Sequence, residues 1–248
     1  MTKQYVQACS AYLDEYTKKE TSSKGTLFGW YHYIDSPDFH TVGVVATAQM
    51  LILIKDSNIC VPFDCTPMLQ SLLDMQNPDG GWSYRSNILN SATEPTALSI
   101  QALLLWNEVL GEKAVPAIEK GISWLLKYMN TACLWGPIKK REKYGYIYFS
   151  CVVLRCLHRL LNFSQVGIKA SLVFKVRSAL ESGCRSLLSA FNNNDTQCGW
   201  GATQNGRVTL FHTAYARVRK KTSHHKVTCF FIGLYRESPY RECYARPT

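Results

Sequence analysis

The residues whose types suit catalysis or metal binding fall into two small polar groups. Asp35 and Asp38 place two carboxylates three residues apart, and carboxylates that share a proton can act as a general acid. The proline between them is equally typical of an exposed turn with solvated carboxylates. Asp195, Cys198 and His212 are residue types that bind zinc. The alternative for His212 is a hydrogen bond within a helix end, or a position facing a cavity.

Aromatic residues form a third candidate group, because they are dense in two helix-patterned segments. They could line an apolar cavity, or they could belong to an ordinary core, where aromatics at helical spacing are frequent. The residues are Tyr144, Tyr146, Tyr148, Phe149, Phe211 and Tyr215. The sequence has no glycine-rich phosphate loop and no G-x-S-x-G motif. It therefore predicts no complete catalytic set.

The elements that must position these groups are organised as a repeat. Four tryptophans at intervals of 52, 53 and 65 residues each lie in a glycine-containing loop: Trp30, Trp82, Trp135 and Trp200. The strongest copy of the loop reads Gln-Asn-Pro-Asp-Gly-Gly-Trp over residues 76–82. A long, nearly constant period predicts stacked supersecondary units.

The heptad at residues 76–82 suits a structural role better than a ligand site. Asp79 and Gly80 favour a tight turn with positive φ, and Gly81 follows directly. The Trp82 ring would cover the end of a neighbouring helix, and its indole N–H would satisfy a carbonyl there. We expect the Gln76 amide to meet the unpaired N–H groups at the start of the next helix.

Each repeat is predicted as an apolar helix, a polar loop and a second, more apolar helix. The fold class is therefore all-α. Ser91 and Glu94 have the spacing of a capping box before one second helix. The predicted helix pairs are 5–16 with 41–55, 68–75 with 96–109, 116–129 with 146–161, and 173–191 with 209–216.

The heptad, with Thr93-Glu-Pro-Thr-Ala-Leu after it, resembles the QW-type repeat of squalene cyclases and other terpene cyclases. The β-subunits of protein prenyltransferases carry related repeats. This resemblance covers about residues 1–216 and implies an (α/α) toroid whose second helices line a central cavity. Members close the ring with five or six helix pairs, whereas about four are recognisable here. The resemblance thus implies an incomplete ring, whose apolar edge a protein partner or self-association would cover.

The same resemblance implies binding of an isoprenoid and, if the chain is active, a terpene cyclase (an isomerase or lyase) or a prenyltransferase. Cyclases of this type use a D-x-D-D acid, and the nearest match is Asp35-Ser-Pro-Asp38. Prenyltransferases bind zinc with D-x-C and a later His. His212 matches that His, but Tyr144-Gly-Tyr146 occupies the D-x-C position. No cofactor is expected unless zinc is bound. Alternative functions are a non-catalytic scaffold or a glycan lyase on a similar toroid.

Charge is concentrated at one end of the chain. The formal net charge is +10, of which residues 217–248 carry +6. The first 216 residues therefore lack the large excess of positive charge that is typical of nucleic-acid-binding domains. We interpret residues 1–216 as the repeat domain. Residues 217–248 form either a basic tail or an irregular segment, disordered or outside the native reading frame. The sequence shows no membrane-length apolar run and no signal peptide, which favours a cytoplasmic protein with its ten cysteines as buried free thiols.

Overall fold

The computed structural model describes residues 3–31, 41–138, 144–163, 167–194, 197–215, 219–220 and 227–228. These residues are mainly helical, and the chain also contains short antiparallel strand pairs. The helices are α1 (Lys3–Glu15), α2 (Val44–Asp56), α3 (Thr66–Asp74), α4 (Thr93–Leu105), α5 (Asn107–Leu110), α6 (Val115–Lys127), α7 (Ile147–Asn162), α8 (Ala170–Ser189) and α9 (Leu210–Tyr215), with a 3₁₀ turn at Gly111–Ala114. The strands are β1 (Thr17–Ser22), β2 (Gly25–Trp30), β3 (Asn192–Asn194), β4 (Gln197–Gly199), β5 (Arg219–Lys220) and β6 (Val227–Thr228).

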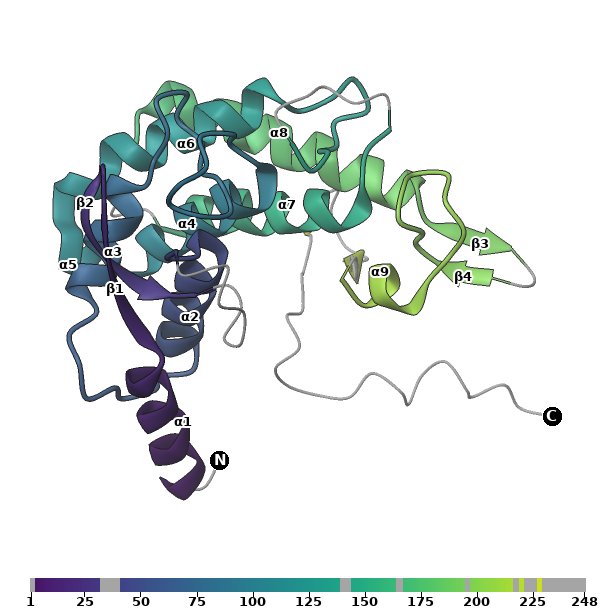
Figure 1. Cartoon of the computed structure of the whole chain (residues 1–248). Coiled ribbons are helices and arrows are strands. Elements are labelled where there is room, and N and C mark those ends of the chain that lie inside the picture. The colour runs from purple at the N-terminus through teal and green to yellow at the C-terminus, as the bar shows by residue number, and fades with distance from the viewer. Residues whose placement is uncertain are drawn as a thin grey trace.

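The helices form a curved array of two layers, as Figure 1 shows. The second helices of the repeats, α2, α4, α7 and α9, follow one another along the inner side of the curve. The first helices α3, α6 and α8 lie on the outer side. None of the described helices is both long and apolar enough to span a bilayer.

Apolar periodicity explains which helix enters which layer. In α6, Ile118, Ile122 and Leu125 follow helical spacing and are buried, whereas Lys120 and Lys127 on other faces are exposed. This one-sided pattern suits an outer helix with one face in solvent. By contrast, α4 has ten buried residues in thirteen, which suits a helix packed between α2, α6 and α7.

A β-hairpin corrects the all-α prediction in the first repeat. Strands β1 and β2 pair antiparallel from Thr17 opposite Trp30 to Ser22 opposite Gly25, where the sequence predicted a loop. Strand β1 contains no apolar residue, so it lacks the alternating apolar signal of a half-buried strand. Burial comes from β2, where Leu27 and Trp30 enter the core. The short β5–β6 pair likewise falls in the segment predicted to be irregular.

The four repeat tryptophans close their helix pairs in the same way. Each indole N–H donates a hydrogen bond to a carbonyl near the end of the preceding first helix. The bonds join Trp30 to Leu13 (3.0 Å), Trp82 to Leu72 (2.7 Å), Trp135 to Leu125 (2.8 Å) and Trp200 to Leu187 (2.7 Å). The carbonyls of a last helical turn have no partner within their own helix, so the indole satisfies one of them in each repeat.

The tryptophan main chain fixes the second helix of the same repeat. Each tryptophan backbone N–H donates to a hydroxyl on the fourth residue of that helix. The bonds join Trp30 to Thr47 (3.1 Å), Trp82 to Thr96 (2.9 Å), Trp135 to Ser150 (2.9 Å) and Trp200 to Thr213 (3.0 Å). Each tryptophan carbonyl accepts from the N–H of the residue just before the helix, which is Gly43, Ala92, Tyr146 or Thr209. One residue therefore sets both the position and the register of its helix pair.

Consecutive repeats are joined by a further main-chain hydrogen bond. The first residue of each second helix donates its N–H to the carbonyl two residues after the next tryptophan. The donors and acceptors are Val44 and Tyr84 (2.9 Å), Thr93 and Pro137 (3.0 Å), and Ile147 and Ala202 (3.0 Å). The N-terminal end of each of these helices is thereby satisfied by the following repeat.

The buried hydroxyl at the fourth helical position should be important for stability. In Thr96→Val the shape is kept, but the buried Trp82 N–H loses its acceptor. We expect the free energy of unfolding to fall by about 1–3 kcal/mol in urea titration. Ser123→Ala is the control, because that hydroxyl is exposed and donates only to its own helix at Glu119. The control should stay within about 0.5 kcal/mol of wild type. Equal losses in both variants would contradict this assignment.

Candidate functional site

The side chain of Gln76 links two repeats. Its Nε2 donates to the carbonyl of Gly80 in its own loop and to the carbonyl of Ala117 in α6, each at 2.9 Å. The prediction that the Gln76 amide would accept from N–H groups at a helix start is therefore wrong, because its NH₂ group donates to two carbonyls instead. The turn at Gly80 has φ of +92°, and a Cβ there would lie 3.0 Å from the carbonyl oxygen of Lys120.

Asp79 and Trp82 complete the contact with α6. The Asp79 carboxylate accepts from the Gly81 N–H (3.2 Å), from the Ser91 hydroxyl (2.6 Å) and from the Trp124 indole (3.2 Å). A Cβ at Gly121 would lie 2.8 Å from the Trp82 ring, so α6 is in close contact with that ring. The heptad residues are thus occupied in holding α3, α4 and α6 together.

The predicted capping box before α4 is not formed. The residue that precedes the helix is Ala92, with extended dihedral angles and no side-chain cap. Ser91 instead donates to Asp79, and Asn77 donates to the Ser91 hydroxyl at 3.0 Å. Glu94 is consequently free to face other elements from the first turn of α4.

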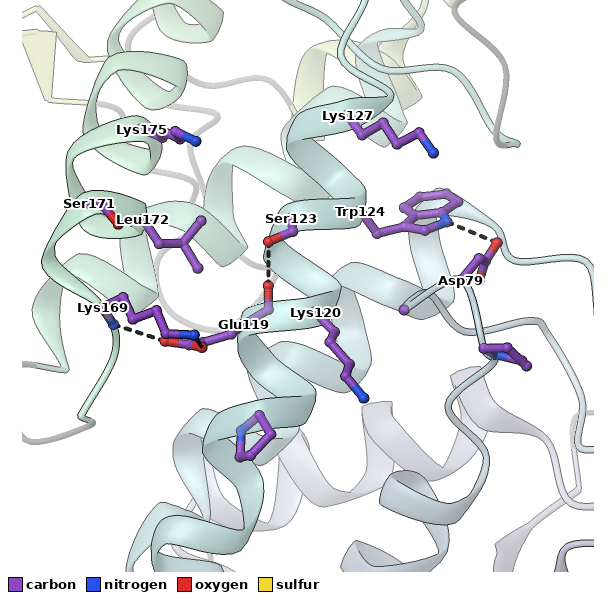
Figure 2. A pocket seen from close by; sticks show the side chains of 13 residues that line it. Asp79, Glu119, Lys120, Ser123, Trp124, Lys127, Lys169, Ser171, Leu172 and Lys175 are labelled. Carbon is purple, nitrogen blue, oxygen red and sulfur yellow. Dashed lines mark hydrogen bonds and ion pairs between the residues drawn. The ribbon is translucent and has the colours of Figure 1, made fainter.

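A groove of about 600 Å³ lies on the outer side, between α6, the start of α8 and the loop at Pro78–Gly80 (Figure 2). Four lysines line it: Lys120, Lys127, Lys169 and Lys175. Its two acidic residues are both engaged. Glu119 accepts from the Lys169 backbone N–H and ammonium, each at 2.9 Å, and Asp79 accepts from Trp124. The groove is basic, and its acidic groups serve the packing of α6.

A second group of side chains lies at the starts of the inner helices. The second residues of α2, α4, α7 and α9 occupy equivalent positions. We call this set the inner row: Val45, Glu94, Tyr148 and Phe211. Glu94 accepts a hydrogen bond from the Tyr148 hydroxyl, and the rings of Tyr148 and Phe211 are 5.8 Å apart. Three consecutive repeats therefore contribute to one continuous cluster.

Glu94 is the only carboxylate in the inner row, and tyrosines surround it. It accepts from the Tyr84 hydroxyl at 3.2 Å as well as from Tyr148. Its position in the first turn of α4 is favourable for a negative charge because of the helix dipole. Burial, with the Glu94 charge beside it, raises the pKa of Tyr84 well above its usual range. The phenol therefore remains a hydrogen-bond donor at physiological pH.

The aromatic part of the cluster is partly open to solvent. The Tyr148 ring centre is 5.2 Å from that of Phe149, and the Phe149 ring is 6.1 Å from Tyr146, both nearly edge to face. The Phe211 ring is 54% exposed, whereas Tyr146, Tyr148 and Phe149 are half-buried. An accessible group of ring faces beside a paired carboxylate is suited to an apolar ligand.

The structure brings together only some of the residues predicted from the sequence. Tyr146, Phe149 and Phe211 share the aromatic cluster, and Tyr215 lies in α9. Asp35, Asp38 and Asp195 lie outside the described residues. The loop tryptophans and the heptad have the structural contacts given above.

The structure describes two of the three residues in the zinc hypothesis, Cys198 and His212. His212 Nδ1 is 2.7 Å from the Thr209 hydroxyl, just before α9, and Cys198 is exposed in β4. Partial burial lowers the His212 pKa, which favours the neutral ring. Within the part of the chain that the structure describes, no three His, Cys, Asp or Glu residues are grouped as metal ligands. Asp195, the third residue of this hypothesis, lies outside the described residues, so zinc binding stays a prediction and no chemical step is derived through a metal.

Cysteines differ in part from the predicted buried thiols. Burial raises the pKa of the Cys65 thiol to about 11 and that of Cys151 and Cys156 further, so these thiols are poor nucleophiles. Cys60 and Cys198 are exposed, and Cys184 is disulfide-bonded.

Sequence analysis named Tyr148 and Phe211 as cavity candidates but missed Glu94 and the equivalence of the inner-row positions, although a signal for it exists. The hydroxyl that meets the tryptophan N–H is followed by a small residue in every repeat: Thr47-Ala, Thr96-Ala, Ser150-Cys and Thr213-Ala. Alignment of the repeats on this hydroxyl, two positions after the inner-row residue, places Glu94, Tyr148 and Phe211 in register. Alignment on the tryptophans does not, because the loop lengths differ.

Comparisons with known proteins give similarities to solved structures only. No family model matches the chain, and no curated protein matches it. Among solved structures, the chain is similar to Candida albicans protein geranylgeranyltransferase-I complexed with GGPP. The TM-score is 0.42 and the identity is 12%, over 86% of this chain and 76% of that chain.

The raised Tyr84 pKa predicts a pH effect on stability. The unfolded chain would ionise Tyr84 near pH 10, whereas the folded protein keeps this phenol protonated. Tyr84 therefore contributes stability that is present below about pH 10 and is lost as the pH rises further. In urea titrations above pH 10, wild type should lose stability more steeply than Tyr84→Phe.

Glu94→Gln serves as the control for this effect. It removes the carboxylate but leaves the burial of Tyr84, which is the larger cause, so its stability should still fall more steeply than that of Tyr84→Phe. Identical pH profiles for wild type and Tyr84→Phe would show that this phenol is not shifted.

Proposed function

We propose that this chain is a repeat protein of the terpene cyclase and prenyltransferase type that binds an isoprenoid small molecule at the inner row. We further propose that it lacks a complete catalytic set of its own. The observation that carries the proposal is the aromatic cluster of Tyr148, Phe149 and Phe211, which the inner helices present beside Glu94.

The architecture supports this class of protein. The second helices lie on the inner side of the curved array, as the (α/α) toroid interpretation requires. The heptad at residues 76–82 makes contacts between consecutive helix pairs, which is the role expected of a repeat motif. The chemical part of the proposal comes from the inner row, since the loop tryptophans are buried.

The chemistry of the inner row suits an unsaturated hydrocarbon. Ring faces offer apolar area and dispersion contacts, and a ligand that covers the exposed Phe211 ring removes that area from water. Both tyrosines beside Glu94 donate to its carboxylate, so neither hydroxyl must be desolvated alone when a ligand binds. The carboxylate itself is also paired, which lowers the cost of an apolar neighbour.

Phe211 should contribute directly to binding. We expect Phe211→Ala to weaken the binding of a fluorescent prenyl diphosphate analogue by roughly 5- to 30-fold, since an aromatic contact contributes on the order of 1–2 kcal/mol. Phe174→Ala is the matched control, because Phe174 is a 74% exposed phenylalanine on the outer helix α8 and should leave affinity unchanged. No binding by wild type, or equal loss in both variants, would refute the proposed site.

Catalysis is tested separately from binding. Incubation of the purified chain with squalene or with a prenyl diphosphate and a peptide thiol should give no cyclised or transferred product. A product that forms with wild type and disappears with Glu94→Gln would show instead that the inner row is catalytic.

Zinc binding is a separate hypothesis that involves Asp195, Cys198 and His212. It requires stoichiometric zinc in the purified protein and loss of that zinc in His212→Ala. Metal analysis of both proteins decides the question independently of isoprenoid binding.

A further inference from the structure

The repeats are joined through a short antiparallel contact with a constant register. The residue just before each second helix is bridged to the residue three positions after the next tryptophan. The bridged pairs are Gly43 with Arg85, Ala92 with Ile138, and Tyr146 with Thr203. Because three contacts share one register, the same geometry can be assigned to the equivalent residues of the fourth repeat.

Two hydrogen bonds flank the bridge. The N–H that follows the bridged residue donates to the next repeat, as from Val44 to the Tyr84 carbonyl. The carbonyl that precedes the bridged residue accepts from the next repeat: Val42 accepts from Ser86, and Gly145 accepts from Gln204, each at 3.2 Å. Each repeat therefore contributes one N–H donor and one carbonyl acceptor to the contact.

The fourth repeat presents the same donor and acceptor at residues 208–210, which we call the joint edge. Thr209 donates to the Trp200 carbonyl at 3.0 Å, and Val208 is bridged to Gly201, so this segment is held as in the other repeats. Among the backbone hydrogen bonds between described residues, none uses the Leu210 N–H or the Val208 carbonyl. These are the equivalents of the Val44 N–H and the Val42 carbonyl.

We propose that the joint edge pairs with the joint edge of a second copy of this chain. An antiparallel contact centred on Thr209 requires an N–H one residue after it and a carbonyl one residue before it. The joint edge has both, so two copies related by a twofold axis form the hydrogen bonds of the internal contacts. Leu210 of each copy donates to Val208 of the other.

The neighbouring side chains suit this arrangement. In the antiparallel register, Arg207 of one copy lies opposite Phe211 of the other, and both are exposed. Pairing would cover the exposed phenylalanine and place a guanidinium against an aromatic ring, not against a second arginine. The contact is short, so the association is weak and concentration-dependent.

Leu210→Pro tests the hydrogen bonds of the pair. Proline removes the N–H donor, but it is tolerated at the first position of a helix. Sedimentation velocity of wild type should show a concentration-dependent dimer, and Leu210→Pro should raise its dissociation constant at least about tenfold. Ala170→Pro is the matched control, because Ala170 is the exposed first residue of α8. A wild type that stays monomeric, or a dimer unaffected by Leu210→Pro, would overturn the proposal.

Thr209→Cys tests the register even if Leu210→Pro folds poorly. Residues opposite each other between the two hydrogen bonds are close enough for a disulfide. Mild oxidation of this variant should join the introduced thiols of two copies, in a crosslink identified by mass spectrometry. Crosslinks only through the exposed Cys60 or Cys198 would contradict the twofold register. Because pairing and an isoprenoid would both cover the Phe211 ring, both experiments use the protein without ligand, so their outcome is independent of the proposed function.

Discussion

The structure depends on satisfying the polar backbone where each tryptophan loop is buried. A loop that enters a core brings N–H and carbonyl groups which lose water and must find partners. Here the tryptophan makes most of these hydrogen bonds. Its indole N–H donates to a carbonyl at the end of the first helix. Its backbone N–H donates to a hydroxyl of the second helix, and its carbonyl accepts from the N–H just before that helix. In the second repeat these are Leu72, Thr96 and Ala92. The helix pair cannot shift without breaking all three bonds.

The position of the inner row follows from that constraint. Because the fourth residue of every second helix is fixed against a tryptophan, the second residue of each helix is brought to an equivalent place. Glu94, Tyr148 and Phe211 therefore meet although more than fifty residues separate each from the next. Their contacts are a consequence of register, and no local motif encodes them.

Sequence periodicity predicted the helices well where apolar residues recur, because the outer helices and α7 have one buried face and α4 is buried almost all round. It missed β1, whose residues are all polar and which is held by pairing with β2. It also assigned Ser91 to a capping box, although the nearby Asp79 carboxylate competes for that hydroxyl. The buried hydroxyls were missed as well, since the pair of a Thr or Ser and a small residue that marks them is recognisable only when the repeats are aligned on it. Partners outside the element itself determine all of these outcomes.

The division of labour within each second helix separates stability from chemistry. The fourth position carries Thr or Ser in each repeat, because the tryptophan N–H needs an acceptor, and this hydroxyl residue is fully buried in the first three repeats. The second position makes none of the closing hydrogen bonds, and it holds Val45, Glu94, Tyr148 and Phe211 in successive repeats. Its side chain can therefore change from aliphatic to acidic to aromatic without disturbing the array. The proposed ligand site, built from such positions, would gain its specificity at little cost to folding, whereas the tryptophan loops, which are easier to recognise in the sequence, determine only where these positions lie.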